Sequence, residues 1–299
     1  MKKTIYILTV LIFSFSCSNE SGNNSQEDNP IINGDVIFRN QTEVNNFDLD
    51  DYESINNLLI QTNSSDDPIV NLNTLTELQS INGSLIIANN YGLNSIEELD
   101  NLTNVGGEVS IVENGLFQSL TGLNNIIGNV SKVNILYNVN LINLDILNNI
   151  NSIETDLNIS GRIENMDSFN DLNSIGGSFD LYGNNGTSFS SISGFSNLQS
   201  IGANLRIYST NLPNLSIFQN ITTLENLDIG DNMNLTTLNG LENLNYISND
   251  LYMGQSTLYT NDYCAIKDLI LSNNIGGNVF FSVNAINNDI EGYFNNNCN

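Results

Sequence analysis

One apolar pattern recurs along most of the chain and restricts what the chain can fold into. In residues 232–253, NMNLTTLNGLENLNYISNDLYM, an apolar residue stands at every third position from Leu235 to Ile247, and alternation follows at Leu251 and Met253. A helix favours mixed spacings of three and four, whereas a strand favours a spacing of two. The pattern therefore predicts a short strand after an irregular or 3₁₀-like segment that turns every third side chain inward.

The pattern occurs eight times. A Leu-x-x-Ile motif or a close variant begins at residues 78, 102, 123, 150, 172, 198, 221 and 244, so the mean spacing is near 24 residues (166 divided by 7). A period of 20–50 residues indicates a solenoid, in which each coil buries its apolar edge against the next. We expect the alternating pair that follows each motif to form one strand of a parallel sheet, with strands about 4.8 Å apart. Glycines between the return segment and the strand would relieve backbone strain: Gly83, Gly106, Gly128, Gly176 and Gly202.

An asparagine stands three residues after the second apolar residue of the strand in five of the eight copies: Asn90, Asn114, Asn138, Asn184 and Asn232. Arg162, Thr210 and Ser256 interrupt this column. The motif I-x-G-x-L-x-I-x-x-N, followed by leucines at period three, resembles the receptor L domain family of leucine-rich folds. That family is known from insulin and epidermal growth factor receptors and is common in bacterial surface proteins.

The resemblance covers about residues 35–299 and carries several implications. It implies a β-rich solenoid, wound as a right-handed coil with one parallel β-sheet, short 3₁₀ or irregular return segments, an N-terminal helix and a C-terminal cap. In leucine-rich repeats an asparagine at this phase lies inside the turn and bonds backbone groups of its own and the adjacent coil. Each such bond contributes about 1 kcal/mol, and ligand contact by these residues is the less favoured alternative. Because the family serves mainly in binding, the resemblance favours recognition over catalysis.

The two ends of the repeat array have their own patterns. Residues 35–77 fit an N-terminal cap and first coil, with a short amphipathic helix over Val44 and Phe47 and a strand at Leu58-x-Ile60. The solenoid would occupy residues 78–259. Residues 260–299 would form the C-terminal cap, with a helix over 265–271 and a last strand at 279–281. Cys264 and Cys298 flank this cap, and in a secreted chain we expect them to form a disulfide.

The N-terminus reads as an export signal. Residues 1–16 carry two lysines and then a short apolar run, which is typical of a cleaved signal peptide. Cys17, directly after Ser16, resembles the lipidated cysteine of bacterial lipoproteins, and a chance cysteine after an ordinary signal is the alternative. Residues 17–34 would be the lipidated cysteine and a flexible tether, with early acids that resemble Bacteroidetes surface-export signals. We therefore expect a lipid anchor at the outer membrane or cell surface of a Gram-negative bacterium.

The middle residue of each strand should face outward, and a solenoid usually binds through this face. The candidate residues are Ser110, Asn134, Asn158, Asp180, Arg206, Asp228 and Tyr252, after a first outward position at Ile86. Asp180 and Asp228 could suggest a glycosidase pair, since two strand steps separate them by roughly 9.6 Å. We favour an Asp-Arg-Asp salt-bridge ladder instead, because the sequence shows nothing that would raise the pKa of either carboxyl group. Tyr137, Tyr208 and Tyr252 could supply stacking surface.

The charge balance limits the classes of partner that the chain can bind. The chain has 33 acidic residues, 7 basic residues and no histidine, so a nucleic acid partner is disfavoured and histidine-based catalysis is impossible. Acidic clusters at 48–53 and 66–67 lack the spacing of a calcium loop, so a solvated surface is the favoured interpretation. We expect no cofactor, no metal and no enzymatic activity. The favoured function is a lipid-anchored recognition or adhesion module for an extracellular protein or glycan. The alternatives are a structural envelope protein that binds nothing and, less favoured, a carbohydrate-active enzyme.

Overall fold

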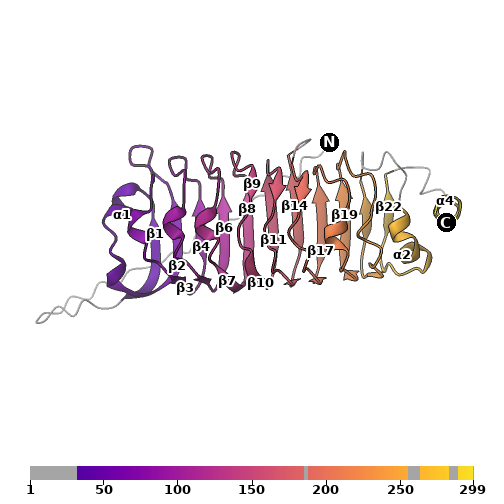
Figure 1. Ribbon diagram of the computed structural model, residues 1–299, viewed down its shortest axis with the longest axis horizontal. Coiled ribbons are helices and arrows are strands. Elements are labelled where there is room, and N and C mark those ends of the chain that lie inside the picture. The colour runs from indigo at the N-terminus through magenta and orange to yellow at the C-terminus, as the bar shows by residue number, and fades with distance from the viewer. Residues whose placement is uncertain (1–31, 185–187, 255–262, 283–288, 299) are drawn as a thin grey trace, which may run out of the picture. The chain divides into compact units, whose positions relative to one another are not determined.

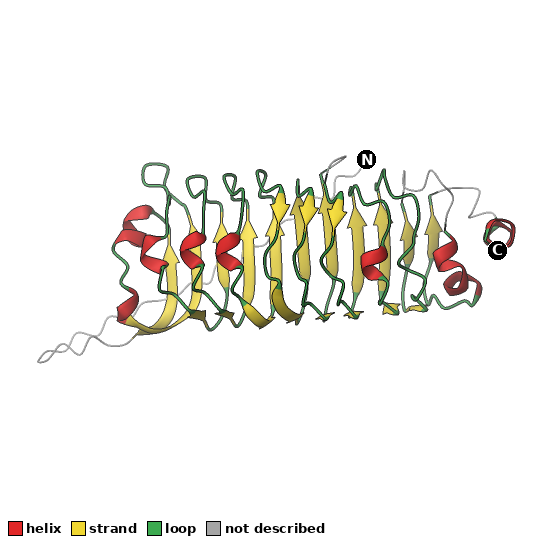
Figure 2. Cartoon of the chain, in the orientation of Figure 1, coloured by secondary structure: helices red, strands yellow, loops and turns green. Residues whose placement is uncertain are grey.

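Parallel β-strands make up most of the structure, a computed structural model that describes residues 32–184, 188–254, 263–282 and 289–298. The described residues belong to one unit, which spans 31–299. The expected signal peptide and Cys17 lie outside the described residues. Strand β1 (Ile32–Phe38) begins within the segment that we expected to be a tether. In Figures 1 and 2 the strands of this unit follow one another side by side in chain order.

Within the described residues, the largest sheet has thirteen strands and is not closed. Its long row contains one strand from each repeat, in the order of the chain, and β1 pairs with β2 at one end. Its long row comprises β2 (Tyr52–Gln61), β4 (Leu85–Ala88), β6 (Glu108–Val112), β8 (Lys132–Leu136), β11 (Leu157–Gly161), β14 (Phe179–Gly183), β17 (Asn204–Tyr208), β19 (Asn226–Gly230), β21 (Leu251–Met253) and β22 (Val279–Phe281). The alternating pairs of the sequence thus lie in strands, and β22 coincides with the predicted last strand.

The register of this row follows the sequence repeat. Phe179 of β14 is opposite Leu157 of β11, and Leu205 of β17 is opposite Phe179. Equivalent apolar residues therefore stack directly on one another from strand to strand. Because side chains alternate between the two faces of a strand, this register places every alternating pair on the same side of the sheet.

The prediction of a single parallel sheet is wrong, because the described return segments form three further sheets of four, three and two strands. Most of the isoleucines that end the Leu-x-x-Ile motifs pair with the next repeat as short strands. These backbone groups need partners once buried, and the neighbouring repeat supplies them. The short strands are β3 (Ser80–Ile81), β5 (Asn104–Val105), β7 (Ile127–Val130), β9 (Asn143–Leu144), β10 (Asn149–Ile153), β12 (Asn165–Met166), β13 (Ser174–Ile175), β15 (Ser191–Ile192), β16 (Ser200–Ile201), β18 (Thr223–Leu224) and β20 (Tyr246–Ile247); β3 and β5 join the large sheet.

Helical structure is short and lies mainly at the ends and in return segments (Figure 2). The N-terminal helix α1 (Gln41–Asn45) is capped by Asn40, whose side chain accepts a hydrogen bond from the Glu43 amide. Val44 is fully buried, whereas Phe47 follows the helix and packs partly buried against the core. Single 3₁₀ turns occur at 49–51, 73–75, 97–99, 121–123, 216–218 and 264–266, and α2 (Lys267–Leu271) and α4 (Ile290–Asn297) lie near the C-terminus.

The apolar residues form one continuous core cluster that includes side chains from every repeat. In residues 232–253, the apolar residues at every third position, from Leu235 to Ile247, are all buried. That stretch contains turns and the short β20 rather than a 3₁₀ helix. Its spacing of three therefore reflects tight turns that return one side chain per step to the core.

Four of the five column asparagines are buried, and three of them, Asn90, Asn114 and Asn138, form a hydrogen-bonded ladder. Asn90 and Asn114 are 0 % exposed, and Asn90 donates its amide Nδ2–H to Asn114 Oδ1 at 3.0 Å. Asn114 in turn donates to Asn138 Oδ1 at 3.3 Å and to the Ile87 carbonyl at 2.9 Å. Asn232 makes the equivalent bond to the Ile207 carbonyl at 2.9 Å. Asn90 and Asn114 thus bond both the preceding and the next repeat, whereas Asn138 and Asn232 donate to a carbonyl of the preceding repeat.

Asn184 is not part of this ladder, so its assignment to the column is corrected. It is exposed, and its backbone N–H donates to Ser188 Oγ at 2.9 Å. Ser188 is fully buried and donates to the Gly161 carbonyl at 2.9 Å. Thr210, which interrupts the sequence column, is also buried and donates to Asn232 Oδ1 at 2.7 Å. Short hydroxyl side chains therefore replace asparagine where the turn differs.

The glycines before the strands are required mainly by close stacking rather than by backbone angles. A Cβ on Gly202 would collide with the Gly176 carbonyl, and a Cβ on Gly176 would collide with the Glu154 carbonyl. Of the five predicted glycines, only Gly128 has a positive φ, at +84°. At Gly176 and Gly202, glycine lets the backbone of one repeat rest on that of the previous repeat.

The C-terminal segment covers the last strand with aromatic side chains. Tyr263 and Phe281 pack edge to face, with ring centroids 5.1 Å apart, and Phe294 of α4 is fully buried. Burial raises the pKa of the Tyr263 hydroxyl to about 12. Cys264 and Cys298 form a disulfide with their Cα atoms 5.4 Å apart. Two segments of this region, 255–262 and 283–288, lie outside the described residues.

Candidate binding face

The predicted face residues lie together in one row. Consecutive members are opposite each other on neighbouring strands, and Phe280 of β22 extends the row beyond Tyr252. Because the residues on either side of each member are in the core, the row faces away from it. We call this set the outer row: Ile86, Ser110, Asn134, Asn158, Asp180, Arg206, Asp228, Tyr252 and Phe280.

After Ile86, the half of the outer row nearer the N-terminus is polar, and its asparagines are hydrogen-bonded. Asn158 donates to Asn134 Oδ1 at 2.7 Å, and Asn134 donates to Glu108 Oε1. Ser110 is only 6 % exposed, although it was predicted to belong to the binding face. Its small side chain lies below its neighbours, so Ser110 offers little surface to a partner.

Charged side chains occupy the centre of the other half. Arg206 Nη1 donates to both carboxylate oxygens of Asp180 at 3.1 Å, which forms an ion pair. Asp228 instead accepts a short hydrogen bond from the Tyr208 hydroxyl. The Arg206–Asp180 pair is the first step of the predicted Asp-Arg-Asp ladder, and the charge of Arg206 also acts on Asp228. A tyrosine that sequence reasoning assigned only to stacking is the hydrogen-bond donor to the second acid.

The expectation that nothing raises the carboxyl pKa values is wrong. Burial raises the pKa of Asp180 above 3.8, against the opposing effect of Arg206. Burial likewise raises the pKa of Asp228, opposed by the hydrogen bond from Tyr208 and by the charge of Arg206. Desolvation therefore outweighs these favourable partners at both acids. Burial and the contact with Asp228 also raise the pKa of Tyr208.

Two pairs of stacked rings flank this charged centre. Tyr182 and Tyr208 have centroids 5.6 Å apart and planes 11° apart, and Tyr252 and Phe280 have centroids 5.0 Å apart and planes 7° apart. A Cβ on Gly230 would collide with the Tyr208 ring, so this glycine makes room for the ring. Tyr137 lies apart from both pairs, in the turn directly after β8.

Sequence reasoning missed Tyr182 and Phe280. Tyr182 directly follows the second apolar residue of its strand, as Tyr208 does, and Phe280 is the middle residue of the last strand. The alternation within each repeat carries this signal, because it places both side chains on the outward side of their strands. We call the combined surface the aromatic–acid patch: Asp180, Tyr182, Arg206, Tyr208, Asp228, Tyr252 and Phe280.

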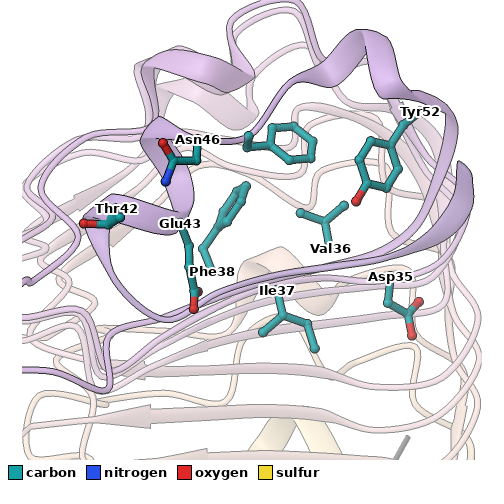
Figure 3. A pocket seen from close by; sticks show the side chains of 9 residues that line it. Asp35, Val36, Ile37, Phe38, Thr42, Glu43, Asn46 and Tyr52 are labelled. Carbon is teal, nitrogen blue, oxygen red and sulfur yellow. The ribbon is translucent and has the colours of Figure 1, made fainter. Parts of the chain in front are cut away.

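A hollow of about 520 Å³ lies at the N-terminal end of the described residues. Figure 3 shows Val36, Phe38 and Tyr52 around it, with α1 on one side. Phe47 also lines it, at 5.2 Å from the Phe38 ring and 5.2 Å from the Tyr52 ring, measured between centroids. The hollow is wide open, and polar side chains line it together with these rings: Asp35, Thr42, Glu43 and Asn46.

The acidic clusters near this end serve as local hydrogen-bond acceptors. Asp48 Oδ1 accepts from the Asp50 amide at 3.0 Å, and Asp67 Oδ2 accepts from the Thr42 amide at 3.0 Å. Within the described ranges there is no group of three or more acidic, cysteine or histidine side chains that could hold a metal ion. The described part of the chain also contains no helix that is long and apolar enough to cross a membrane.

Comparison of the chain with profiles of known protein families, with curated proteins and with solved structures finds no match.

Proposed function

We propose that the protein is a lipid-anchored recognition or adhesion module, which binds an extracellular protein or glycan through the outer face of its large sheet. The observation that carries this proposal is the aromatic–acid patch. Residues 22 to 28 positions apart in sequence meet there in register and place rings and paired charges on one exposed face. Such combinations of aromatic and paired polar groups are typical of binding surfaces.

The fold that we propose is a right-handed solenoid like that of the receptor L domain family. Three features support it: the in-register parallel pairing of successive repeats, the single core cluster and the buried asparagine ladder. A solenoid needs ends that shield its terminal coils. In this proposal α1 with β1 covers one end, and the disulfide-linked C-terminal segment covers the other.

The proposed location is the outer membrane or cell surface of a Gram-negative bacterium, with the lipid attached to Cys17 after cleavage of residues 1–16. Metabolic labelling with a palmitate analogue tests the anchor. The parent chain should be labelled and found in the membrane fraction, and Cys17→Ala should remove the label. Equal labelling of the two chains, or no labelling of the parent, would contradict the anchor.

Binding is tested with the full chain carrying Cys17→Ala, on arrays of extracellular proteins and of glycans. A specific partner whose binding weakens when residues of the outer row are substituted supports recognition through this face. The structural alternative predicts that neither array yields a partner. With 33 acidic and 7 basic residues, we expect no binding to nucleic acid, because the phosphate backbone would be repelled.

One observation favours a carbohydrate-active enzyme as a second candidate: both Asp180 and Asp228 have raised pKa values. An acid–base pair, however, requires two environments that separate the pKa values of its members. Here burial acts on both acids in the same direction, and each already has a hydrogen-bond donor, Arg206 or Tyr208. Turnover of a bound glycan that Asp180→Asn or Asp228→Asn abolishes would favour the enzyme over the binding module.

A further inference from the structure

The aromatic–acid patch is continuous across five neighbouring strands. β14, β17, β19, β21 and β22 are consecutive in the sheet order, so the patch extends over four strand steps, or roughly 19 Å at about 4.8 Å per step. One ring pair, Tyr182 and Tyr208, stands on β14 and β17, two residues along these strands from Asp180 and Arg206. The other pair stands on β21 and β22, and Asp228 on β19 lies between the two pairs. A surface of this length suits an extended ligand better than a compact small molecule.

The rings at the C-terminal end of the patch are the most accessible. Tyr252 is 37 % exposed and Phe280 is 47 % exposed, although both carry large apolar rings. Nearly parallel rings stacked in pairs hold each other in place, so a ligand would meet a preorganised surface. Aromatic rings can pack against the apolar C–H faces of sugar rings, while the hydroxyl groups of the sugar remain available for hydrogen bonds.

The polar centre of the patch is rich in hydrogen-bonding groups but carries little net charge. Asp180 is paired with Arg206, and Asp228 accepts from Tyr208, so the three charged side chains sum to a formal charge of −1. Hydroxyl groups can donate to both carboxylates and accept from the guanidinium group and the tyrosine hydroxyls. A polyanion, in contrast, would be repelled by a chain with a net charge of −26.

From this arrangement we propose that the aromatic–acid patch binds an uncharged polysaccharide, whose sugar rings lie against Tyr252 and Phe280 and whose hydroxyl groups bond Asp180, Arg206 and Asp228. This inference rests on the proposed recognition function and narrows its partner to a neutral glycan. It also restricts the contact to the part of the sheet from β14 to β22.

Affinity electrophoresis tests the inference, with the full chain carrying Cys17→Ala run through gels that contain soluble glucan, mannan, galactan or xylan. At least one of these neutral polysaccharides should retard the chain. Substituting both exposed rings, Tyr252→Ala with Phe280→Ala, should weaken that binding by at least about tenfold. The matched control is Tyr246→Ala, which removes a ring of similar exposure (47 %) from β20 in another sheet and should bind as the parent does.

Two further arms use pectate as an anionic polysaccharide and an array of extracellular proteins. If only pectate or a protein binds, or if a neutral polysaccharide binds the ring double variant as well as the parent, the neutral-glycan inference is overturned while recognition by the chain stands. If no probe binds in any arm, both the inference and the proposed function are contradicted. Unfolding midpoints of the ring variants should match the parent's, which separates lost contact from lost fold.

Discussion

At the scale of single residues, the buried asparagines explain how thin repeats are held at a fixed spacing. Asn114 donates to Asn138 and to the Ile87 carbonyl, and its own Oδ1 accepts from Asn90. Such a residue satisfies backbone groups that the core would otherwise leave unpaired. The preceding residue is strained in several copies, for example Glu113 with φ 56° and Tyr137 with φ 58°. The ladder therefore stabilises a turn that disfavours ordinary side chains.

Asn114→Ala should destabilise the protein strongly, because it removes these bonds and leaves buried polar groups without partners. We expect a loss of about 2 to 4 kcal/mol in the free energy of unfolding, measured by urea denaturation. The matched control is Asn184→Ala at an exposed position, which should change stability by less than about 0.5 kcal/mol. Similar urea midpoints for the two variants would contradict a stabilising role for the asparagine ladder.

Asp228 should make stability depend on pH in a direction opposite to that of an ordinary paired carboxylate. Burial raises its folded-state pKa above 3.8, so the folded chain holds this proton more tightly than the unfolded chain does. Its contribution to stability is therefore greatest at low pH and falls as the pH rises through the folded-state pKa. Asp228→Asn keeps an acceptor for Tyr208 and removes the charge. It should unfold at a higher temperature than the parent at pH 7, and the difference should shrink below pH 3.8. A lower melting temperature for Asp228→Asn at pH 7 would show that the charge is stabilising.

At the scale of elements, the spacing between repeats depends on backbone contact as much as on the apolar core. Gly202 rests on the Gly176 carbonyl, and Gly176 rests on the Glu154 carbonyl. Each of these glycines follows a short strand, β13 or β16, and precedes a strand of the large sheet, β14 or β17, so it sets how closely one repeat approaches the previous one. Any Cβ there would separate two strands that pair in register.

Gly202→Ala should therefore cost about 1 to 3 kcal/mol of unfolding free energy, as overpacking does in other tightly packed sites. Gly115→Ala is the matched control, because a Cβ at Gly115 has no neighbouring atom within 4 Å. Alanine restricts the unfolded chain more than glycine does, so Gly115→Ala should leave the free energy of unfolding unchanged or raise it by about 0.5 kcal/mol. Thermal unfolding of the two variants and the parent measures the difference in stability. An unchanged melting temperature for Gly202→Ala would refute the role of backbone contact.

At the scale of the described unit, one core cluster extends from Val36 in β1 to Cys298 at the end of α4. Each repeat buries its apolar residues against its neighbours, so the last strand depends on what covers it. Phe281 of β22 is fully buried, and Tyr263 packs against it beside the disulfide-bonded Cys264. The C-terminal segment thus completes the core.

Loss of the disulfide should destabilise the protein by about 3 to 4 kcal/mol, the value expected for a closed loop of about 35 residues. The variant is Cys264→Ser with Cys298→Ser, and urea denaturation with tyrosine fluorescence as the signal measures the effect. In the parent, mass spectrometry after alkylation should find neither cysteine free. Two free thiols, or an unchanged midpoint in the variant, would contradict a stabilising role for this bond.

The sequence by itself determined which residues face the core and which strands follow each other, because a period of two inside a period near 24 can be satisfied by few arrangements. It also placed Asp180, Arg206 and Asp228 on neighbouring strands of one face. Only the tertiary structure showed the additional short sheets, the start of β1 at Ile32, and that Ser188 rather than Asn184 fills the buried turn position. It alone also showed that Tyr182 stacks on Tyr208 and Tyr252 on Phe280. The physical reason is that periodicity fixes the side of the backbone on which a residue lies. Hydrogen-bond partners, ring contacts and desolvation depend instead on the neighbouring repeat, which is distant in sequence.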